Sequence, residues 1–314
     1  MITREFQAMG CKMSVQLDVD EGDIHLLEVV PQWFEDWEQS LSRFRDDSEL
    51  SRVNHNPGVW QHVSDVFWQV FQLSLDTYIF SSGLVTPTIL PALENAGYEL
   101  SFVPGGFISG KSVQPSLLDT PDIRDIEYSP DRQEIKLPDG MRLDFGGIAK
   151  GWSAHQAMRR LEKYGPVLVN AGGDISISEP RLNGHPWKVG IIDPLEPERD
   201  IVHLSLTSGG LATSGKDYRA WRQNGILRHH IIDPLNGEPA FSDILTCSVF
   251  AATVMEAEAA AKVLFILGID NEEPWLAKHP NLAALQVMDD GCLRATPTIK
   301  QYFSRENDTT IRFN

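Results

Sequence analysis

Cysteine is scarce in this chain, which has three among its 314 residues. Cys11, Cys247 and Cys292 show no C-x-x-C spacing, and complete disulfide pairing would leave one thiol over. These facts argue against a zinc finger, a dithiol redox site and a disulfide-stapled fold. We expect reduced thiols, as in a cytoplasmic protein.

Long apolar runs are missing as well, since no stretch approaches the roughly 18 residues that read as a membrane-spanning helix. The first eleven residues end on a cysteine, as a lipoprotein leader does. However, Arg4, Glu5 and Gln7 interrupt the apolar segment that a leader requires. The sequence therefore predicts no membrane segment, signal peptide or lipobox, and we expect a cytoplasmic protein.

Positive charge is in short supply, with 27 Lys and Arg residues against 44 Asp and Glu, a formal net charge of −17. This balance opposes a broad phosphate-binding surface, so we expect no nucleic acid partner. A ligand that carries phosphate must be held by cations gathered locally. The hydrophobic content of 42% is that of a folded protein, and the length suits one large domain or two ordinary ones.

Four stretches show the three- and four-residue apolar spacing of helices. They cover residues 26–41, 65–80, 148–164 and 255–267. Ser64 is placed to cap the second stretch, while Gly165 and Gly268 are placed to end the third and fourth. Pro31 is the weak point of the first.

Strand-like patterns are more numerous and shorter. The candidates are residues 12–18, 134–137, 141–145, 167–170, 174–178, 187–192, 201–206, 230–232, 245–251 and 283–288. Residues 97–110 and 119–131 are rich in turn formers or polar residues and are interpreted as connections. Because helices and strands are mixed without regular βαβ alternation, the expected fold class is α+β.

Residues 144–152 (DFGGIAKGW) join a predicted strand to a predicted helix. The two glycines let the backbone approach a ligand closely, and a helix N-terminus offers N–H groups and a positive dipole end. Lys150 could add a mobile charge for a phosphate or carboxylate. The alternative is a tight turn with Lys150 in solvent.

A second glycine pair lies within residues 170–174 (NAGGD), between two apolar strand candidates. Alone, Gly172 and Gly173 predict a hairpin turn that uses positive φ. Their functional interpretation is a glycine floor beneath a bound ring or phosphate.

Scarce cations gather between Arg219 and His230, which include Arg222, Arg228 and His229. Arginine suits phosphate oxygens, and histidine can move a proton near neutral pH. The alternative is a solvated basic loop with one core histidine. Farther on, Glu258 and Lys262 are four residues apart on a predicted helix, where a surface ion pair would explain them.

In this order, the segments resemble the ApbE family of FAD:protein FMN transferases. The resemblance runs from Met9 to about Gly268. Its motifs are LSRFRDDSELSRVN (41–54), TPTILP (86–91), LDFGGIAKG (143–151), NAGGD (170–174), TSG (213–215) and HIIDP (230–234) followed by Gly237. Their agreement in type and order makes the resemblance specific.

The resemblance implies a single ApbE-like domain over residues 1–314, related to the tunnelling fold, with FAD in a cleft between two interleaved lobes. It implies that FMN is moved from FAD onto a threonine hydroxyl of an acceptor protein, with release of AMP and with magnesium as metal. By match, the residues that would line the flavin nucleotide are Met9, Phe44, Val85, Thr86, Asp144, Lys150 and His230. His230 is the catalytic candidate, and Gly172, Gly173 and Arg219 are further binding candidates.

The implied metal site lies between the carbonyl of Gly147 and a pair on the late helix, where the family has Asp and Thr. Here that pair is Glu258 and Lys262. Glutamate can ligate magnesium, whereas a protonated lysine has no lone pair to offer. Its ammonium could instead occupy the place of the metal. Two other functions therefore stay open beside the transferase: a non-catalytic FAD-binding protein, and an FAD pyrophosphatase that yields FMN and AMP.

Overall fold

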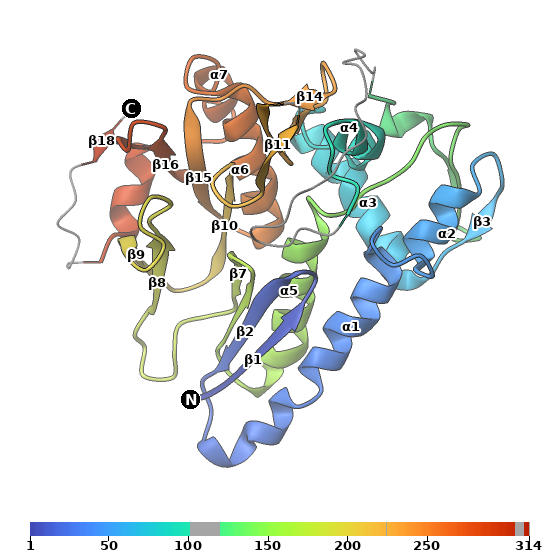
Figure 1. The fold of residues 1–314 in the computed structure, drawn as a ribbon. Helices are drawn as coiled ribbons and strands as arrows, with labels where there is room; N and C mark the ends of the chain where they lie inside the picture. The colour runs from blue at the N-terminus through green and yellow to red at the C-terminus, as the bar shows by residue number, and fades with distance from the viewer. Residues whose placement is uncertain (101–119, 224, 305–310, 314) are drawn as a thin grey trace. The chain divides into compact units, whose positions relative to one another are not determined.

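The computed structural model describes residues 1–100, 120–223, 225–304 and 311–313 (Figure 1). The chain forms two compact units, each assembled from separate stretches. Unit 1 comprises Met1–Trp33, Lys150–Asp217 and Phe241–Asn314, and unit 2 comprises Phe34–Ala149 and Tyr218–Ala240. Both contain helices and mostly antiparallel strands, which confirms the expected α+β class.

Unit 1 is built around a nine-stranded sheet within the described residues. In sheet order its strands are β1 (Ile2–Ala8), β2 (Cys11–Leu17), β6 (Val167–Ala171), β7 (Asp174–Ile177), β10 (Gly209–Gly215), β15 (Ile244–Ala251), β16 (Ala283–Met288), β17 (Leu293–Ala295) and β18 (Arg312–Phe313). The β17–β18 pair is parallel, and the others are antiparallel. On β2, the predicted alternation holds: Met13, Val15 and Leu17 are buried, and the residues between them are not.

Two helices of unit 1 carry residues of the candidate site. Helix α5 (Ala149–Leu161) follows the first glycine motif, and helix α6 (Val254–Leu267) packs on β10 and β15. Thr253 caps α6 by accepting the N–H of Glu256, and Gly268, at φ +64°, ends it as predicted. The other elements are η1 (Glu21–Leu27), η4 (Glu162–Tyr164), β8 (Trp187–Ile192), β9 (Asp200–Leu206), α7 (Glu273–Leu276) and η5 (Pro297–Tyr302).

Unit 2 is mainly helical, with small sheets. Its elements are the greater part of α1 (Val30–Leu41), then α2 (Glu49–His55), β3 (Gln61–His62), α3 (Asp65–Phe80), η2 (Pro87–Ile89), α4 (Leu90–Asn95), η3 (Ile123–Asp125), β4 (Glu127–Ser129), β5 (Glu134–Lys136), β11 (Ala220–Gln223), β12 (Ile226–His229), β13 (Ile232–Asp233) and β14 (Glu238–Pro239). Strands β3, β5 and β4 form one antiparallel sheet, while β11–β12 and β13–β14 are paired separately.

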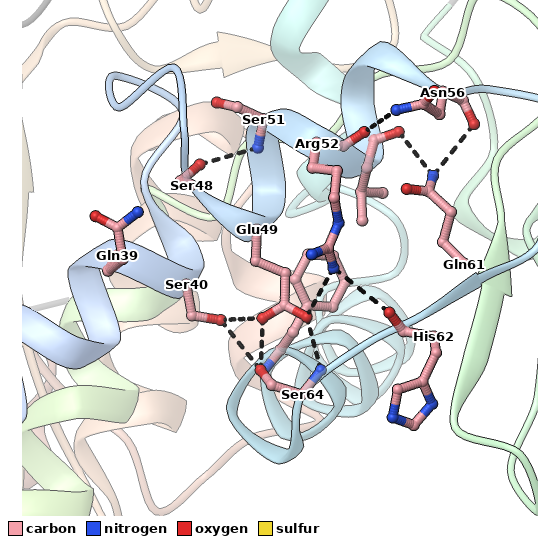
Figure 2. A network of polar contacts seen from close by, with 12 residues as sticks. Gln39, Ser40, Ser48, Glu49, Ser51, Arg52, Asn56, Gln61, His62 and Ser64 are labelled. Carbon is pink, nitrogen blue, oxygen red and sulfur yellow. Dashed lines mark hydrogen bonds and ion pairs between the residues drawn. The ribbon is translucent and has the colours of Figure 1, made fainter.

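The carboxylate of Glu49 ties three helices of unit 2 together (Figure 2). It accepts hydrogen bonds from the Ser40 hydroxyl of α1 at 2.6 Å and from the Ser64 hydroxyl at 2.5 Å. Ser64 caps α3, as predicted, by accepting the N–H of Phe67. Ser48 caps α2 in the same way through the N–H of Ser51. One polar network therefore fixes the starts of α2 and α3.

Three of the predicted elements differ from the structure. The helix predicted over residues 26–41 begins at Val30, because Pro31 suits the first turn of a helix and not its interior. The strand predicted over residues 141–145 is absent from the described sheets. Instead, the backbone N–H and C=O of Leu143 bond the side chain of Asn54. The strand predicted over 230–232 is split, since β12 ends at His229 and β13 begins at Ile232.

Of the two predicted connections, residues 101–110 of the first and residue 119 of the second lie outside the described residues. The described part of the second contains η3 and β4, which the sequence pattern did not predict. All three cysteines are free thiols. Within the described ranges, every helix is too short or too polar to cross a bilayer.

Candidate functional site

Four charged side chains meet in unit 1, two of them buried carboxylates and two of them half-buried ammonium groups. Lys150, in the first turn of α5, forms an ion pair with Asp174 at the start of β7. On α6, the ammonium of Lys262 lies 3.2 Å from Oε1 of Glu258, and Lys150 lies 3.9 Å from the same oxygen. Two ammonium groups and two carboxylates thus form one cluster, here called the Lys150–Lys262 cluster. The ion pair of Glu258 and Lys262, predicted at the surface, has a buried carboxylate and a half-buried ammonium.

Glu258 is the centre of this cluster, with a side chain only 3% exposed. Burial raises the pKa of its carboxyl, and the negative charge of Asp174 raises it further. The positive charges of Lys262 and Lys150 oppose this shift but do not cancel it. The other oxygen, Oε2, accepts the backbone N–H of Gly151 at 3.1 Å. A Cβ at Gly151 would lie 2.5 Å from that oxygen, so glycine permits this approach.

Two tight turns lie at the same end of the unit 1 sheet as this cluster. Met9 and Gly10 turn β1 into β2, and Gly172 and Gly173 turn β6 into β7; all four have positive φ. The ends coincide because β2 pairs with β6. The second turn confirms the predicted hairpin.

The two glycines of the second turn differ in their surroundings. A Cβ at Gly172 would lie 2.6 Å from Cβ of Cys11, whereas a Cβ at Gly173 would meet no described atom within 4 Å. The N–H of Gly173 donates to Asn170 at 2.8 Å. Gly172 is therefore required for packing, and Gly173 borders open space, as a floor beneath a ligand would.

In unit 2, Arg43 organises the other group of candidate residues. Its Nε donates to Oδ2 of Asp144 at 2.5 Å, and its second amino group donates to the carbonyl of Tyr98 at 2.7 Å. The guanidinium lies over the rings of Phe44 and Tyr98, 4.1 Å and 4.9 Å from their centroids. The carboxylate of Asp144 also accepts the N–H of Gly146. Phe44 and Asp144 are thus brought together by a residue that we did not single out.

The ring of Tyr98 connects this group to the cation-rich segment. It stacks on Trp221 at 5.4 Å and meets the ring of His230 edge-on at 6.4 Å. The turn containing Val85 and Thr86 leads directly to Pro87. The carbonyl of Pro87 accepts the N–H of Asp144 at 2.8 Å, which places this turn beside Asp144. Sequence reasoning missed both Tyr98 and Trp221, which no motif marked.

The remaining cations of that segment separate into different roles. His229 is buried, with Nε2 3.0 Å from the carbonyl of Ala240, so it is the core histidine of the alternative interpretation. Arg228 pairs with Glu238, and Arg222 donates to the carbonyl of Gly225. Both interactions are local to the hairpins. Arg219 is half-buried just before β11, and its role stays a prediction.

A sequence model described as the ApbE family matches residues 9–286, most of the chain. The chain belongs to the ApbE family. Curated relatives named FAD:protein FMN transferase include that of Treponema pallidum, 28% identical over 92% of this chain and 84% of its own length. The one of Haemophilus influenzae is 26% identical over 92% and 86%.

Solved structures of ApbE proteins share the fold. The crystal structure of the ApbE protein of Thermotoga maritima aligns with a TM-score of 0.85 at 22% identity, over 97% of this chain and 99% of that one. The flavin transferase ApbE of Vibrio cholerae aligns with a TM-score of 0.76 at 21% identity, over 96% and 99%.

The residues at the implied metal site of this ApbE chain do not suit a divalent cation. Glu258 already faces the ammonium groups of Lys262 and Lys150 and an amide N–H. Lysine offers no lone pair, and two nearby positive charges repel a metal ion. In the described part of the chain, no three His, Cys, Asp or Glu side chains are grouped as metal ligands. Gly147 follows Asp144 in unit 2, whereas Glu258 and Lys262 belong to unit 1.

Proposed function

We propose that this protein is an FAD:protein FMN transferase that moves FMN from FAD onto a threonine hydroxyl of an acceptor protein. The observation that carries this proposal is the family match over residues 9–286, together with curated relatives of that name along most of the chain. Those relatives are enzymes of group transfer, so the reaction class is a transferase. The two groups of candidate residues described above are the parts of the chain that would serve it.

In the proposed reaction, the threonine oxygen attacks the phosphorus on the FMN side of the FAD pyrophosphate. One oxygen–phosphorus bond forms, the pyrophosphate bond breaks, and AMP leaves with the bridging oxygen. Such a transfer depends on in-line positioning and on neutralising charge on the phosphate oxygens. The hydroxyl proton passes to a base, for which His230 is our candidate because histidine titrates near neutral pH.

Each group of residues has a separate part in this proposal. The glycine turn at Gly173 and the ammonium of Lys150 would contact phosphate, with Met9 at the neighbouring turn. Phe44, near the ring of Tyr98, would meet the flavin or adenine ring. The Arg43–Asp144 pair holds that aromatic wall in place.

Some finer expectations remain part of the proposal. The protein would act as one domain of two interleaved lobes, in the cytoplasm, on an acceptor with a threonine motif. Magnesium is what the family resemblance adds, at Gly147, Glu258 and Lys262. Because the last two residues do not fit a divalent ion, the proposed steps use only the protein's own groups.

Incubation of the protein with FAD and an acceptor domain, with and without Mg²⁺, tests the proposal. Chromatography separates three outcomes. Covalent FMN on the acceptor with one equivalent of AMP supports the transferase. Free FMN and AMP with an unmodified acceptor would instead mean an FAD pyrophosphatase. Intact FAD that co-elutes with the protein would mean a binding protein.

A further inference from the structure

We propose that the ammonium of Lys262 stands where a divalent cation would stand, so that this site binds its phosphate ligand without a metal. The identity of that ligand, the pyrophosphate of FAD, rests on the proposed function. The absence of a metal requirement rests on the Lys150–Lys262 cluster alone.

Both carboxylate oxygens of Glu258 already have partners within the protein. A magnesium ligand must direct an oxygen lone pair at the ion. Here Oε2 accepts the N–H of Gly151 at 3.1 Å, and Oε1 faces Lys262 at 3.2 Å and Lys150 at 3.9 Å. Both oxygens therefore have cationic or N–H partners within the protein itself.

The charges of the Lys150–Lys262 cluster also oppose a metal ion. The buried carboxyl groups of Asp174 and Glu258 face the half-buried ammonium groups of Lys150 and Lys262. A divalent ion added here would lie beside two ammonium groups in a poorly solvated environment, where repulsion is strong. The two ammonium groups already match all the negative charge that the two carboxylates can supply.

Two hydrogen bonds to Glu258 hold the ammonium of Lys262 in place. Its ammonium donates to Oε1 of Glu258 and to the backbone carbonyl of Glu258 at 3.3 Å, both one helical turn away on α6. An ammonium has three N–H groups. Among the described residues, the third has no acceptor within hydrogen-bond distance. With 17% of the side chain exposed, it is positioned to donate to a phosphate oxygen.

A metal titration tests the inference without relying on turnover. Full-length protein, free of FAD, is titrated with Mn²⁺ as a paramagnetic substitute for Mg²⁺, and free Mn²⁺ is read by electron paramagnetic resonance. We expect no bound Mn²⁺ in the wild type and one equivalent in the double variant Glu258→Asp, Lys262→Thr. Binding of Mn²⁺ by the wild type would overturn the inference, and so would its absence in a folded double variant.

FAD affinity supplies the second readout, measured by flavin fluorescence in EDTA and in Mg²⁺. The wild type should bind equally in both, and Lys262→Met should bind about tenfold more weakly in EDTA, the loss of one charge-assisted hydrogen bond. Lys163→Met, which removes an exposed lysine elsewhere in unit 1, is the matched control and should not change. Unchanged affinity in Lys262→Met would reduce the cluster to a structural ion pair and overturn the inference.

Lys262→Arg guards against a folding defect, since it keeps a cation at this position and should retain metal-free FAD binding; loss of that binding in the folded variant would contradict the inference. The two proposals fail separately. Metal-free, Lys262-dependent FAD binding without transfer would contradict only the proposed function. Transfer that occurs strictly with Mg²⁺ would contradict only the inference.

Discussion

Arg43 and Asp144 are 101 positions apart in the sequence, yet Nε of the arginine lies 2.5 Å from a carboxylate oxygen of the aspartate. Their side chains are 5% and 9% exposed, so this ion pair is buried. Because the same guanidinium also contacts Phe44 and Tyr98, one interaction fixes the aromatic and acidic candidates of unit 2 relative to each other.

Arg43→Met should therefore destabilise the protein by about 3–5 kcal/mol, since it leaves the buried carboxylate of Asp144 without its cation. Arg45→Met is the matched control. Its guanidinium pairs with the exposed Glu35, and such a surface pair contributes less than about 1 kcal/mol. Urea denaturation followed by circular dichroism measures both. Equal losses in the two variants would contradict the role given to Arg43.

Substitution of the adjacent residues His229 and His230 should have different effects, one on stability and the other on the rate of transfer. His230→Ala should lower the rate of transfer by about 10²–10⁴-fold and change FAD affinity much less, because a proton-handling group acts in the transition state. His229→Ala should instead cost about 1–3 kcal/mol of stability, since it leaves the buried carbonyl of Ala240 without its partner. Stopped assays and thermal denaturation of both variants provide the comparison. A fall in FAD affinity with unchanged turnover would make His230 a positioning residue.

The glycine turn offers a second matched pair. Gly172→Ala should be the more destabilising change, because its Cβ would lie 2.6 Å from Cβ of Cys11 in addition to the positive φ. Gly173→Ala has the φ cost alone, about 1–2 kcal/mol. If Gly173 borders the ligand, its variant should nonetheless lose more FAD affinity than its loss of stability explains. Calorimetric titration with FAD measures that excess, and no excess would return Gly173 to a purely structural turn.

We expect the free energy of unfolding to depend on pH through His155. Burial lowers its pKa, and the positive charge of Arg159 lowers it further. As the pH falls, the unfolded chain is therefore protonated first, at a pH of about 6.5. The contribution of His155 to the free energy of unfolding is complete above that pH, and it is lost as the pH falls through the folded-state pKa. His155→Gln should lessen the loss of urea resistance between neutral and mildly acidic pH. An unaltered pH profile would contradict this assignment.

Local patterns in the sequence were sufficient to predict several turns, helix caps and helix ends. The hairpin at Gly172 and Gly173 follows from neighbouring residues, because a two-residue turn between apolar strands needs positive φ. The same holds for the cap at Ser64 and the helix end at Gly268, where the bonding partners are a few residues away.

Interactions between distant parts of the chain could not be predicted in this way. Residues 141–145 alternate like a strand, but the side chain of Asn54 takes both backbone bonds of Leu143. Arg43 looked like one residue of a motif until the fold placed Asp144 beside it. The spacing of Glu258 and Lys262 predicts a surface ion pair, but spacing carries no information about burial, and the Glu258 side chain is only 3% exposed.

Intact-mass spectrometry of an acceptor domain directly detects the transfer of FMN from FAD. After incubation with the wild-type protein and FAD, we expect the acceptor to gain the mass of one FMN with loss of water, and its Thr→Val variant to gain nothing. An acceptor of unchanged mass, in a mixture where the protein has bound FAD, would contradict the transferase activity.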